Sequence, residues 1–402
     1  MVGTVLPVWN RSVPADGTGR AQLTLFAMTF LYAVSVTMIG PLMPLIISTF
    51  DLRLSLAGLL VSFQQLGGAL AIIGSALFAD RAHKPLLIAL AFSVYSLGLF
   101  SIAAAPGYAV LAAAFLAVGS GSRFFDTVAN ADTAEWNPGR SALYLSLLHT
   151  VFAVGALTGP LYVSILVQAG ASWSTIFVGL GAAAAVAVAV YVTRPRFRNR
   201  RSVASTTLRP GSVVDVVRAP RMWIACAVML SYTAHQAGFS VWLPMYLQTS
   251  LLASPHLGAM ALSFYWLGII IGRLLSARLA VIITIKRQLW AGALIGTLVL
   301  LAAFSARDPL LLTGAALLAG IAGAGVIPNL VTLCCSWFPA NTATASSMLF
   351  LSASIGHMIS PWLIASVTER SSFDIGFLIP ILALAVTAAL ATGLPQPERS
   401  VS

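Results

Sequence analysis

Few residues of this chain could do chemistry, because only 8% of its 402 residues are charged and 59% are hydrophobic. The most informative is Asp126, an acid within a long apolar stretch, which Asn130 follows one helical turn later. An ionisable side chain in such surroundings is costly and by default marks function. Burial favours the neutral form, so Asp126 could exchange a proton, and the Asn130 carboxamide could bind hydroxyl groups. We therefore predict proton coupling at Asp126 and substrate binding at Asn130.

Both residues also have a structural interpretation. Arg123 lies three residues before Asp126, at ion-pair spacing on one helix face, and a permanent pair would keep the aspartate ionised. Asn130 could instead donate a hydrogen bond to a neighbouring helix, as polar residues in membrane bundles commonly do. From the sequence alone, the functional and the structural interpretations of Asp126 and Asn130 both remain open.

The other binding candidates are amide, imidazole and aromatic side chains inside apolar stretches. Such groups suit sugars, which present a hydroxyl rim and apolar C–H faces. These candidates are His149, Gln64, Gln65, Gln236, Asn329, Trp242, Tyr232 and Trp266. Only one of the adjacent pair Gln64 and Gln65 can face a cavity, because neighbouring side chains on a helix diverge by about 100°. The alternatives are hydrogen bonds between helices for the polar residues and an interfacial aromatic belt for Trp242.

Several classes of chemistry have no support in the sequence. It contains no phosphate-cradling G-x-x-x-x-G-K-[ST] loop, so ATP does not drive the protein directly. No spacing of His, Cys and Asp suggests a metal site, and no nucleophile has a base beside it. The three cysteines lie in apolar runs and indicate no disulfide framework. We expect neither an enzyme nor a cofactor.

The elements that position these residues are predicted to be membrane-spanning helices. A soluble domain carries about 25% charged residues, and charge as sparse as here cannot cover a water-facing surface. The apolar runs are about 20 residues long without alternation, which indicates helices that satisfy their own backbone groups in lipid. We predict twelve spans, at 22–49, 55–79, 84–104, 107–132, 141–168, 172–193, 221–249, 257–281, 288–305, 309–336, 342–366 and 373–394.

The charge distribution predicts the orientation. An even number of spans places both termini on one side, and basic residues mark the cytosolic side. With cytosolic tails at 1–21 and 396–402, the outer loops hold only Arg53, Arg307 and Arg370, whereas the 194–220 segment alone holds seven arginines. We read 194–220 as a basic cytosolic linker that attracts anionic lipid headgroups, with no nucleic-acid role. The expected location is a bacterial-type inner (plasma) membrane.

The two halves, 22–193 and 221–395, repeat one another. Gly74 recurs as Gly272, at an offset of 198, and Gly155 and Pro160 recur as Gly356 and Pro361, at offsets of 201. Two duplicated six-helix halves joined by a cytosolic loop describe the major facilitator architecture, in which substrate binds near the midplane between the halves. The predicted fold class is therefore an all-α membrane protein with the twelve-helix major facilitator fold.

One segment carries the signature of this superfamily. The run GSALFADRAHK resembles the loop between spans 2 and 3 of major facilitators, G-x-L-x-D-R-x-G-R-K, with matches at Gly74, Asp80, Arg81 and Lys84. The resemblance implies a latch that holds the inward gate shut and breaks when the halves rock. It implies nothing about the substrate.

A narrower resemblance covers most of the chain. Four segments resemble spans 4, 5, 7 and 8 of the fucose–galactose–proton symporter family and its glucose-transporting branch, namely 126–130, 148–156, 232–246 and 263–273. The resemblance implies a hexose substrate and a protonation site at Asp126. Two positions depart from the family, because Gly40 and Gln236 stand where relatives keep acids. Coupling would then rest largely on Asp126, and facilitated diffusion is an alternative.

The leading hypothesis is a sugar permease, working as a proton symporter or as a uniporter. The main alternative is a proton-antiport exporter of drugs or metabolites, for which the glycine–proline segment from Gly155 to Pro160 is the supporting feature. The expected partners are a small-molecule substrate, protons and the lipid bilayer, and we expect a monomer. No appended soluble domain supports a sensor, and no catalytic cluster supports a membrane enzyme.

Overall fold

The computed structural model describes residues 18–78, 83–137, 140–194, 213–280 and 282–395. The predictions for Asp80, for Arg81 and for the tails at 1–17 and 396–402 lie outside these ranges, whereas residues 18–21, expected in the N-terminal tail, are helical in the structure. The N half contains α1 (Thr18–Phe50), α2 (Leu54–Phe78), α3 (Lys84–Ala103), α4 (Tyr108–Trp136), α5 (Ser141–Gln168) and α6 (Trp173–Val192). The C half contains α9 (Pro220–Thr249), α10 (Pro255–Leu279), α11 (Ile285–Ala306), α12 (Pro309–Gly323), α13 (Val326–Trp337), α14 (Thr342–Arg370) and α15 (Phe373–Thr392).

The predicted spans are confirmed. Eleven stretches in the described ranges are long and apolar enough to cross a membrane, with α12 and α13 counting as one. The twelfth span is α9, which has 30 residues and is more polar because it carries Tyr232, Thr233, His235 and Gln236. Part of the segment expected to be a linker is also helical, as α8 (Val213–Arg218).

One predicted span differs in detail, because 309–336 is interrupted between α12 and α13. The break falls at Ala324 and Gly325, shortly before Pro328. A proline has no backbone N–H to donate, and its ring clashes with the carbonyl four residues earlier, which here belongs to Ala324. Pro328 therefore cannot form the helical hydrogen bond to the Ala324 carbonyl, and the helix is interrupted at that residue.

The ends of several helices are set by local side chains. Capping oxygens accept hydrogen bonds from first-turn backbone N–H groups at Ser172, Ser254, Thr284, Asp308 and Ser372. Proline occupies the first turn of α3, α9, α10 and α12, where no N–H is needed. These signals explain why the helix boundaries follow the sequence closely.

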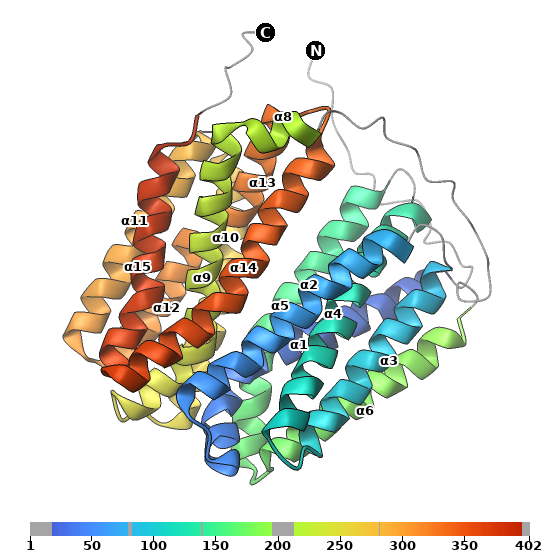
Figure 1. Ribbon diagram of the computed structural model, residues 1–402, viewed down its shortest axis with the longest axis vertical. Coiled ribbons are helices and arrows are strands. Elements are labelled where there is room, and N and C mark those ends of the chain that lie inside the picture. The colour runs from blue at the N-terminus through green and yellow to red at the C-terminus, as the bar shows by residue number, and fades with distance from the viewer. Residues whose placement is uncertain (1–17, 79–82, 138–139, 195–212, 281, 396–402) are drawn as a thin grey trace, which may run out of the picture.

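The two halves lie side by side, with α2 facing α14 across the boundary and α5 facing α10 (Figure 1). We call the end where α1 begins and α15 ends the terminal end, and the opposite end the distal end. The hydrogen bonds across the boundary join Ser55 to Glu369, Ser62 to the Met358 carbonyl, Ser164 and Gln168 to His256, and Ser263 to the Leu157 carbonyl.

These contacts lie between the distal end and the middle of the bundle. The ribbons of the halves separate toward the terminal end (Figure 1). The backbones approach very closely where they meet. Gly40 of α1 packs against the Ser240 carbonyl of α9, and Gly58 of α2 packs against the Pro361 carbonyl of α14. The two halves therefore make their closest described contacts at the distal end, and their backbones lie farther apart toward the terminal end.

Candidate functional site

The N half contributes a polar cluster on one face of α4. The Arg123 Nη1 atom lies 3.8 Å from Asp126 Oδ2, and the Asn130 side-chain amide donates to Asp126 Oδ1 at 3.1 Å. The Arg123 and Asp126 side chains remain 37% and 29% exposed. The predicted ion pair therefore forms, but it is loose and partly accessible. A proton or a polar solute could compete with Arg123 for the carboxylate.

Side chains from three other helices surround this cluster. The buried Tyr32 side chain of α1 lies within electrostatic reach of Arg123. His149 of α5 is exposed and lies within electrostatic reach of Asp126. His357 of α14 lies within electrostatic reach of Arg123, although it belongs to the other half. One C-half residue, His357, is therefore within electrostatic reach of the N-half cluster.

The tautomer of His357 follows from its hydrogen bond. Its Nδ1 lies 2.9 Å from the Ala353 carbonyl oxygen, which can only accept. Nδ1 therefore carries the proton of the neutral ring, and Nε2 is left as an acceptor. This arrangement suits a substrate hydroxyl that donates.

The C half contributes an aromatic surface. His235 and Phe239 of α9 stack with ring centroids 5.4 Å apart, and Phe239 lies 5.0 Å from Tyr265 of α10. Tyr232 is buried beside His235, and Gln236 is buried beside Tyr265. Two predicted ligands, Tyr232 and Gln236, are thus packed into a buried aromatic layer.

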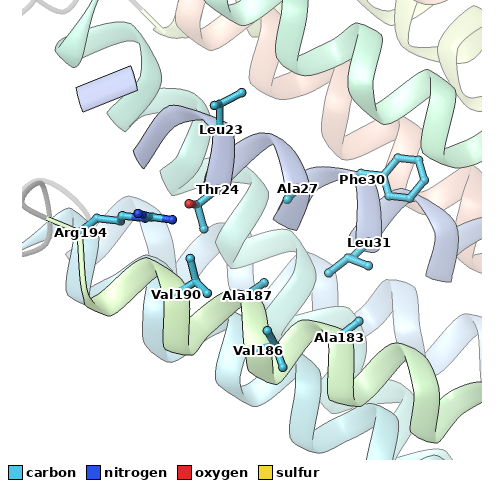
Figure 2. A pocket seen from close by; sticks show the side chains of 10 residues that line it. All are labelled: Leu23, Thr24, Ala27, Phe30, Leu31, Ala183, Val186, Ala187, Val190 and Arg194. Atoms are coloured by element: carbon cyan, nitrogen blue, oxygen red, sulfur yellow. The ribbon is translucent and has the colours of Figure 1, made fainter. Parts of the chain in front are cut away.

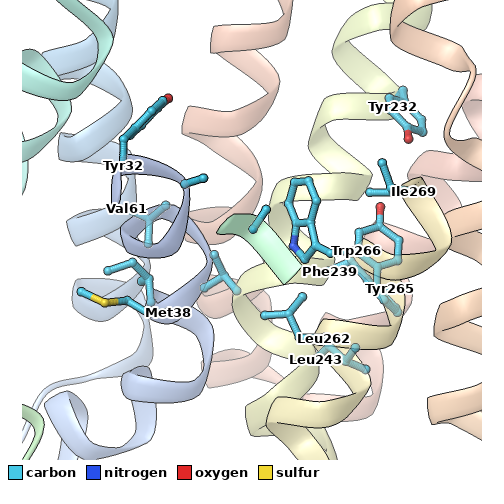
Figure 3. Packing of buried hydrophobic residues seen from close by; sticks show 14 of the residues in the cluster. Tyr32, Met38, Val61, Tyr232, Phe239, Leu243, Leu262, Tyr265, Trp266 and Ile269 are labelled. Carbon is cyan, nitrogen blue, oxygen red and sulfur yellow. The ribbon is translucent and has the colours of Figure 1, made fainter. Parts of the chain in front are cut away.

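Trp266 is placed differently from its neighbours. Figure 3 shows its indole between α10 and the N-half residues Tyr32, Met38 and Val61. Its Nε1–H is buried and has no hydrogen-bond partner in the described ranges. Buried polar groups nearly always have partners, so an unpaired donor at the boundary between the halves needs an explanation. A bound solute would supply the missing acceptor.

Other predicted ligands make contacts within one half. The Asn329 side chain donates to Ser276 at 3.0 Å and to Gln288 at 3.1 Å, which joins α13 to α10 and α11 near the terminal end. Gln64 is buried, and its backbone packs against Gly119 of α4. Gln65 is half-buried beside it. These positions are not brought together with Asp126 by any described contact.

Trp242 is buried inside the C half. Its Nε1–H donates to the Pro361 carbonyl oxygen at 2.9 Å, and its ring meets Phe373 edge to face at 6.1 Å. Only 1% of the residue is exposed. The indole therefore links α9 to α14 at the level where α2 also approaches Pro361.

Changing Trp242 to phenylalanine should lower stability without changing substrate affinity. The variant loses one interhelical hydrogen bond, which is worth about 1–2 kcal/mol in the free energy of unfolding. Thermal unfolding in detergent and KM for uptake would measure the two effects. Trp223→Phe is the matched control, because that indole is 57% exposed and donates within its own segment to Val217. A raised KM at unchanged stability would instead place Trp242 in the substrate site.

The Gly74–Lys84 motif lies only partly within the residues that the structure describes. Gly74 faces Phe124, since an added Cβ would lie 3.9 Å from its ring. Lys84 forms an ion pair with Glu135, which joins the beginning of α3 to the end of α4. Sequence reasoning did not anticipate Glu135 as this partner.

Sequence reasoning also missed Tyr32. One signal could have found it, because Tyr32 and Tyr232 are 200 residues apart, close to the offset of the repeat. Tyr32 contacts Arg123 in the N half, and Tyr232 lies within electrostatic reach of Arg273 in the C half. Each half therefore has a tyrosine near an arginine, but only the tyrosines correspond in the repeat, because Arg123 lies on α4 and Arg273 on α10.

Comparison with known proteins agrees with this architecture. The family model of the Major Facilitator Superfamily matches residues 25–254 and 236–402. This chain belongs to the Major Facilitator Superfamily. Proteins of this superfamily are transporters and not enzymes, so the prediction of a non-enzymatic membrane transporter is confirmed.

The relatives within the superfamily are distant. The chain is 23% identical over 353 residues to the glucose/mannose transporter GlcP of Bacillus subtilis (strain 168). The aligned residues cover 85% of this chain and 86% of that protein. Among solved structures, a bacterial homologue of the human lysosomal transporter Spinster, inward-facing and unoccupied, matches with a TM-score of 0.79 and 18% identity over 96% of this chain and 98% of that chain. The nucleoside transporter NupG matches with a TM-score of 0.72 and 14% identity over 93% and 98%. The predicted twelve-helix fold is confirmed.

Proposed function

We propose that this protein is a secondary transporter for a hexose or a related sugar, with a binding site between the halves and proton coupling through Asp126. The observation that carries the proposal is the cluster of Arg123, Asp126 and Asn130, which is partly exposed and lies within electrostatic reach of His357 of the other half. Alternating access requires a site that both halves line, and the nearness of His357 to the cluster supports such a site here.

The sugar specificity is supported by the chemistry of the lining and by one relative. Asp126, Asn130 and His149 offer donors and acceptors for a hydroxyl rim, and Trp266 offers an aromatic face together with an unpaired N–H. The distant relative GlcP is a glucose/mannose transporter. The resemblance of four spans to the fucose–galactose–proton symporters points in the same direction.

The coupling role rests on Asp126 because other acids are missing where relatives keep them. Gly40 lies in the close contact between α1 and α9, where no carboxylate would fit, and Gln236 is an amide. Protonation of Asp126 would remove its attraction to Arg123 and free the guanidinium for another acceptor. Binding of proton and sugar would then be linked through a single ion pair.

We further propose that the terminal end faces the cytosol, following the distribution of basic residues. The conformation described here is then inward-facing. The chain would act as a monomer in a bacterial inner membrane, and its two gates would be the distal contacts and the Gly74–Lys84 segment.

Uptake in proteoliposomes tests the proposal. Purified protein would be reconstituted and offered a panel of labelled sugars, with and without an inward proton gradient. We expect uptake of at least one hexose, with accumulation above the external concentration only when the gradient is present. Uptake that does not depend on the proton gradient would indicate a uniporter. No uptake of any sugar would reject the sugar assignment.

A proton-antiport exporter is the second candidate. Its supporting feature is the glycine–proline segment of α5, in which Gly155 and Gly159 pack against the α1 backbone at Phe30 and Val34. The same vesicles can be loaded with a fluorescent dye. Dye efflux driven by a proton gradient, without sugar uptake, would favour this alternative.

A further inference from the structure

A second hollow lies away from the Asp126 cluster, between α1 and α6. Its volume is about 730 Å³, and its walls are apolar apart from Thr24 and Arg194 (Figure 2). Alanines on both helices, such as Ala27 and Ala187, leave space that larger side chains would fill. The hollow runs from the terminal end toward the middle of the bundle, because α1 begins and α6 ends there.

The hollow is separate from the transport site. It is lined by Leu31, whereas the neighbouring Tyr32 contacts Arg123 on another face of α1. Side chains at its rim are strongly exposed, with Leu23 at 65% and Val186 at 63%. Both helices are membrane spans, so hydrocarbon is the medium that covers such side chains.

The terminal end of the hollow carries a positive charge. Arg194 follows the last turn of α6, and Figure 2 shows its side chain reaching toward Thr24 of α1. Its Nε–H is buried and has no hydrogen-bond partner in the described ranges. A guanidinium group binds phosphate oxygens through paired hydrogen bonds, and an unpaired buried N–H is a site for one of them.

An apolar hollow with one cation at its membrane-surface end matches one class of molecule. We infer that the hollow between α1 and α6 binds an anionic phospholipid, with an acyl chain along the apolar walls and the phosphate held by Arg194. Each methylene that leaves water contributes to binding, so the apolar walls favour an acyl chain over a small polar ligand. This inference does not depend on which solute the protein transports.

Lipid-dependent thermal stability in detergent tests the inference. Phosphatidylglycerol should raise the unfolding temperature of the full chain more than phosphatidylcholine of the same chain length. Arg194→Gln should abolish that preference and weaken phosphatidylglycerol binding about five-fold, the effect expected for one basic residue near a headgroup. Ala183→Phe, which fills the apolar wall, should reduce the response to both lipids.

Matched variants keep the test decisive. Arg140→Gln removes an exposed arginine outside the hollow and should leave the preference unchanged, and Arg194→Lys should retain part of it. Unfolding temperatures without lipid show whether each variant is folded. Equal responses of Arg194→Gln and the unchanged protein to phosphatidylglycerol would overturn the inference. A similar stabilisation by inorganic phosphate alone would also overturn it, because the ligand would then be a soluble anion.

Discussion

Replacing Gly58 with alanine is expected to reduce uptake about ten-fold by preventing closure of the distal end. A Cβ atom at this position would lie 2.7 Å from the Pro361 carbonyl oxygen and 2.9 Å from the Trp362 Cα atom. Both atoms belong to the α14 backbone, which cannot move aside as a flexible side chain can. Overpacking of this kind costs about 1–3 kcal/mol, enough to shift a two-state equilibrium by about 5–150-fold.

The same variant should change which conformation is populated. Ser263 is buried at the boundary between α10 and α5, where its hydroxyl donates to the Leu157 carbonyl. A cysteine at this position, in a background with the three native cysteines replaced by alanine, would report distal opening. We expect Gly58→Ala to increase its labelling by a membrane-impermeant maleimide, because the distal-closed state is disfavoured.

Gly314 provides the control for this prediction. It lies within α12, and an added Cβ there would meet nothing within 4 Å. Alanine in a helix interior is normally favourable by up to about 1 kcal/mol relative to glycine, so Gly314→Ala should be neutral or stabilising. If Gly58→Ala transports as well as Gly314→Ala and leaves position 263 unlabelled, the close contact between α2 and α14 has no role in gating.

Replacing Asp126 with asparagine is expected to abolish accumulation driven by a proton gradient while sugar exchange continues. Asparagine keeps the size of the side chain and, like a protonated aspartate, is neutral with one donor group and one carbonyl acceptor, but it cannot exchange a proton. One pH unit supplies about 1.4 kcal/mol, so coupling to one proton supports about ten-fold accumulation. In proteoliposomes, the ratio of internal to external sugar concentration should approach about ten for the unchanged protein. For Asp126→Asn, the same ratio should stay near one.

Two further variants separate coupling from structure. Asp374 pairs with Arg307 at 3.1 Å at the distal end, and Asp374→Asn should keep normal accumulation. Asp126→Glu should restore part of the gradient response. Unchanged accumulation by Asp126→Asn would remove the coupling role. Loss of both accumulation and exchange would instead indicate that the pair with Arg123 serves folding.

The spans could be predicted from the sequence because bilayer thickness sets their length and local residues end them. The break between α12 and α13 begins four residues before Pro328, but Pro160 and Pro244 lie inside unbroken helices, so a proline alone does not predict a break. The cluster of Arg123, Asp126 and Asn130 could also be predicted from the sequence, because residues three, four and seven apart lie on one face of a helix. Tyr32 and Glu135 were missed because their partners lie on other helices.

The two tryptophans show where sequence reasoning ends. Trp242 and Trp266 both stand in apolar helices and suit a sugar equally well. The structure pairs the Trp242 N–H with the Pro361 carbonyl, whereas the Trp266 N–H, near the N half, has no partner among the residues that the structure describes. The pattern of residues along a helix shows on which side of the helix a residue lies. Which other helix contacts that side depends on how the helices pack.

The sequence by itself determined the membrane class, the twelve spans, the duplication and the superfamily, because these depend on length, composition and repeated motifs along the chain. Only the tertiary structure decided that the halves make their closest described contacts at the distal end, and it explains why Gly40 replaces an acid. That position touches the Ser240 carbonyl, 200 residues away in the chain. Contacts between backbones so far apart in sequence are set by the packing of the two halves, and no local pattern encodes them.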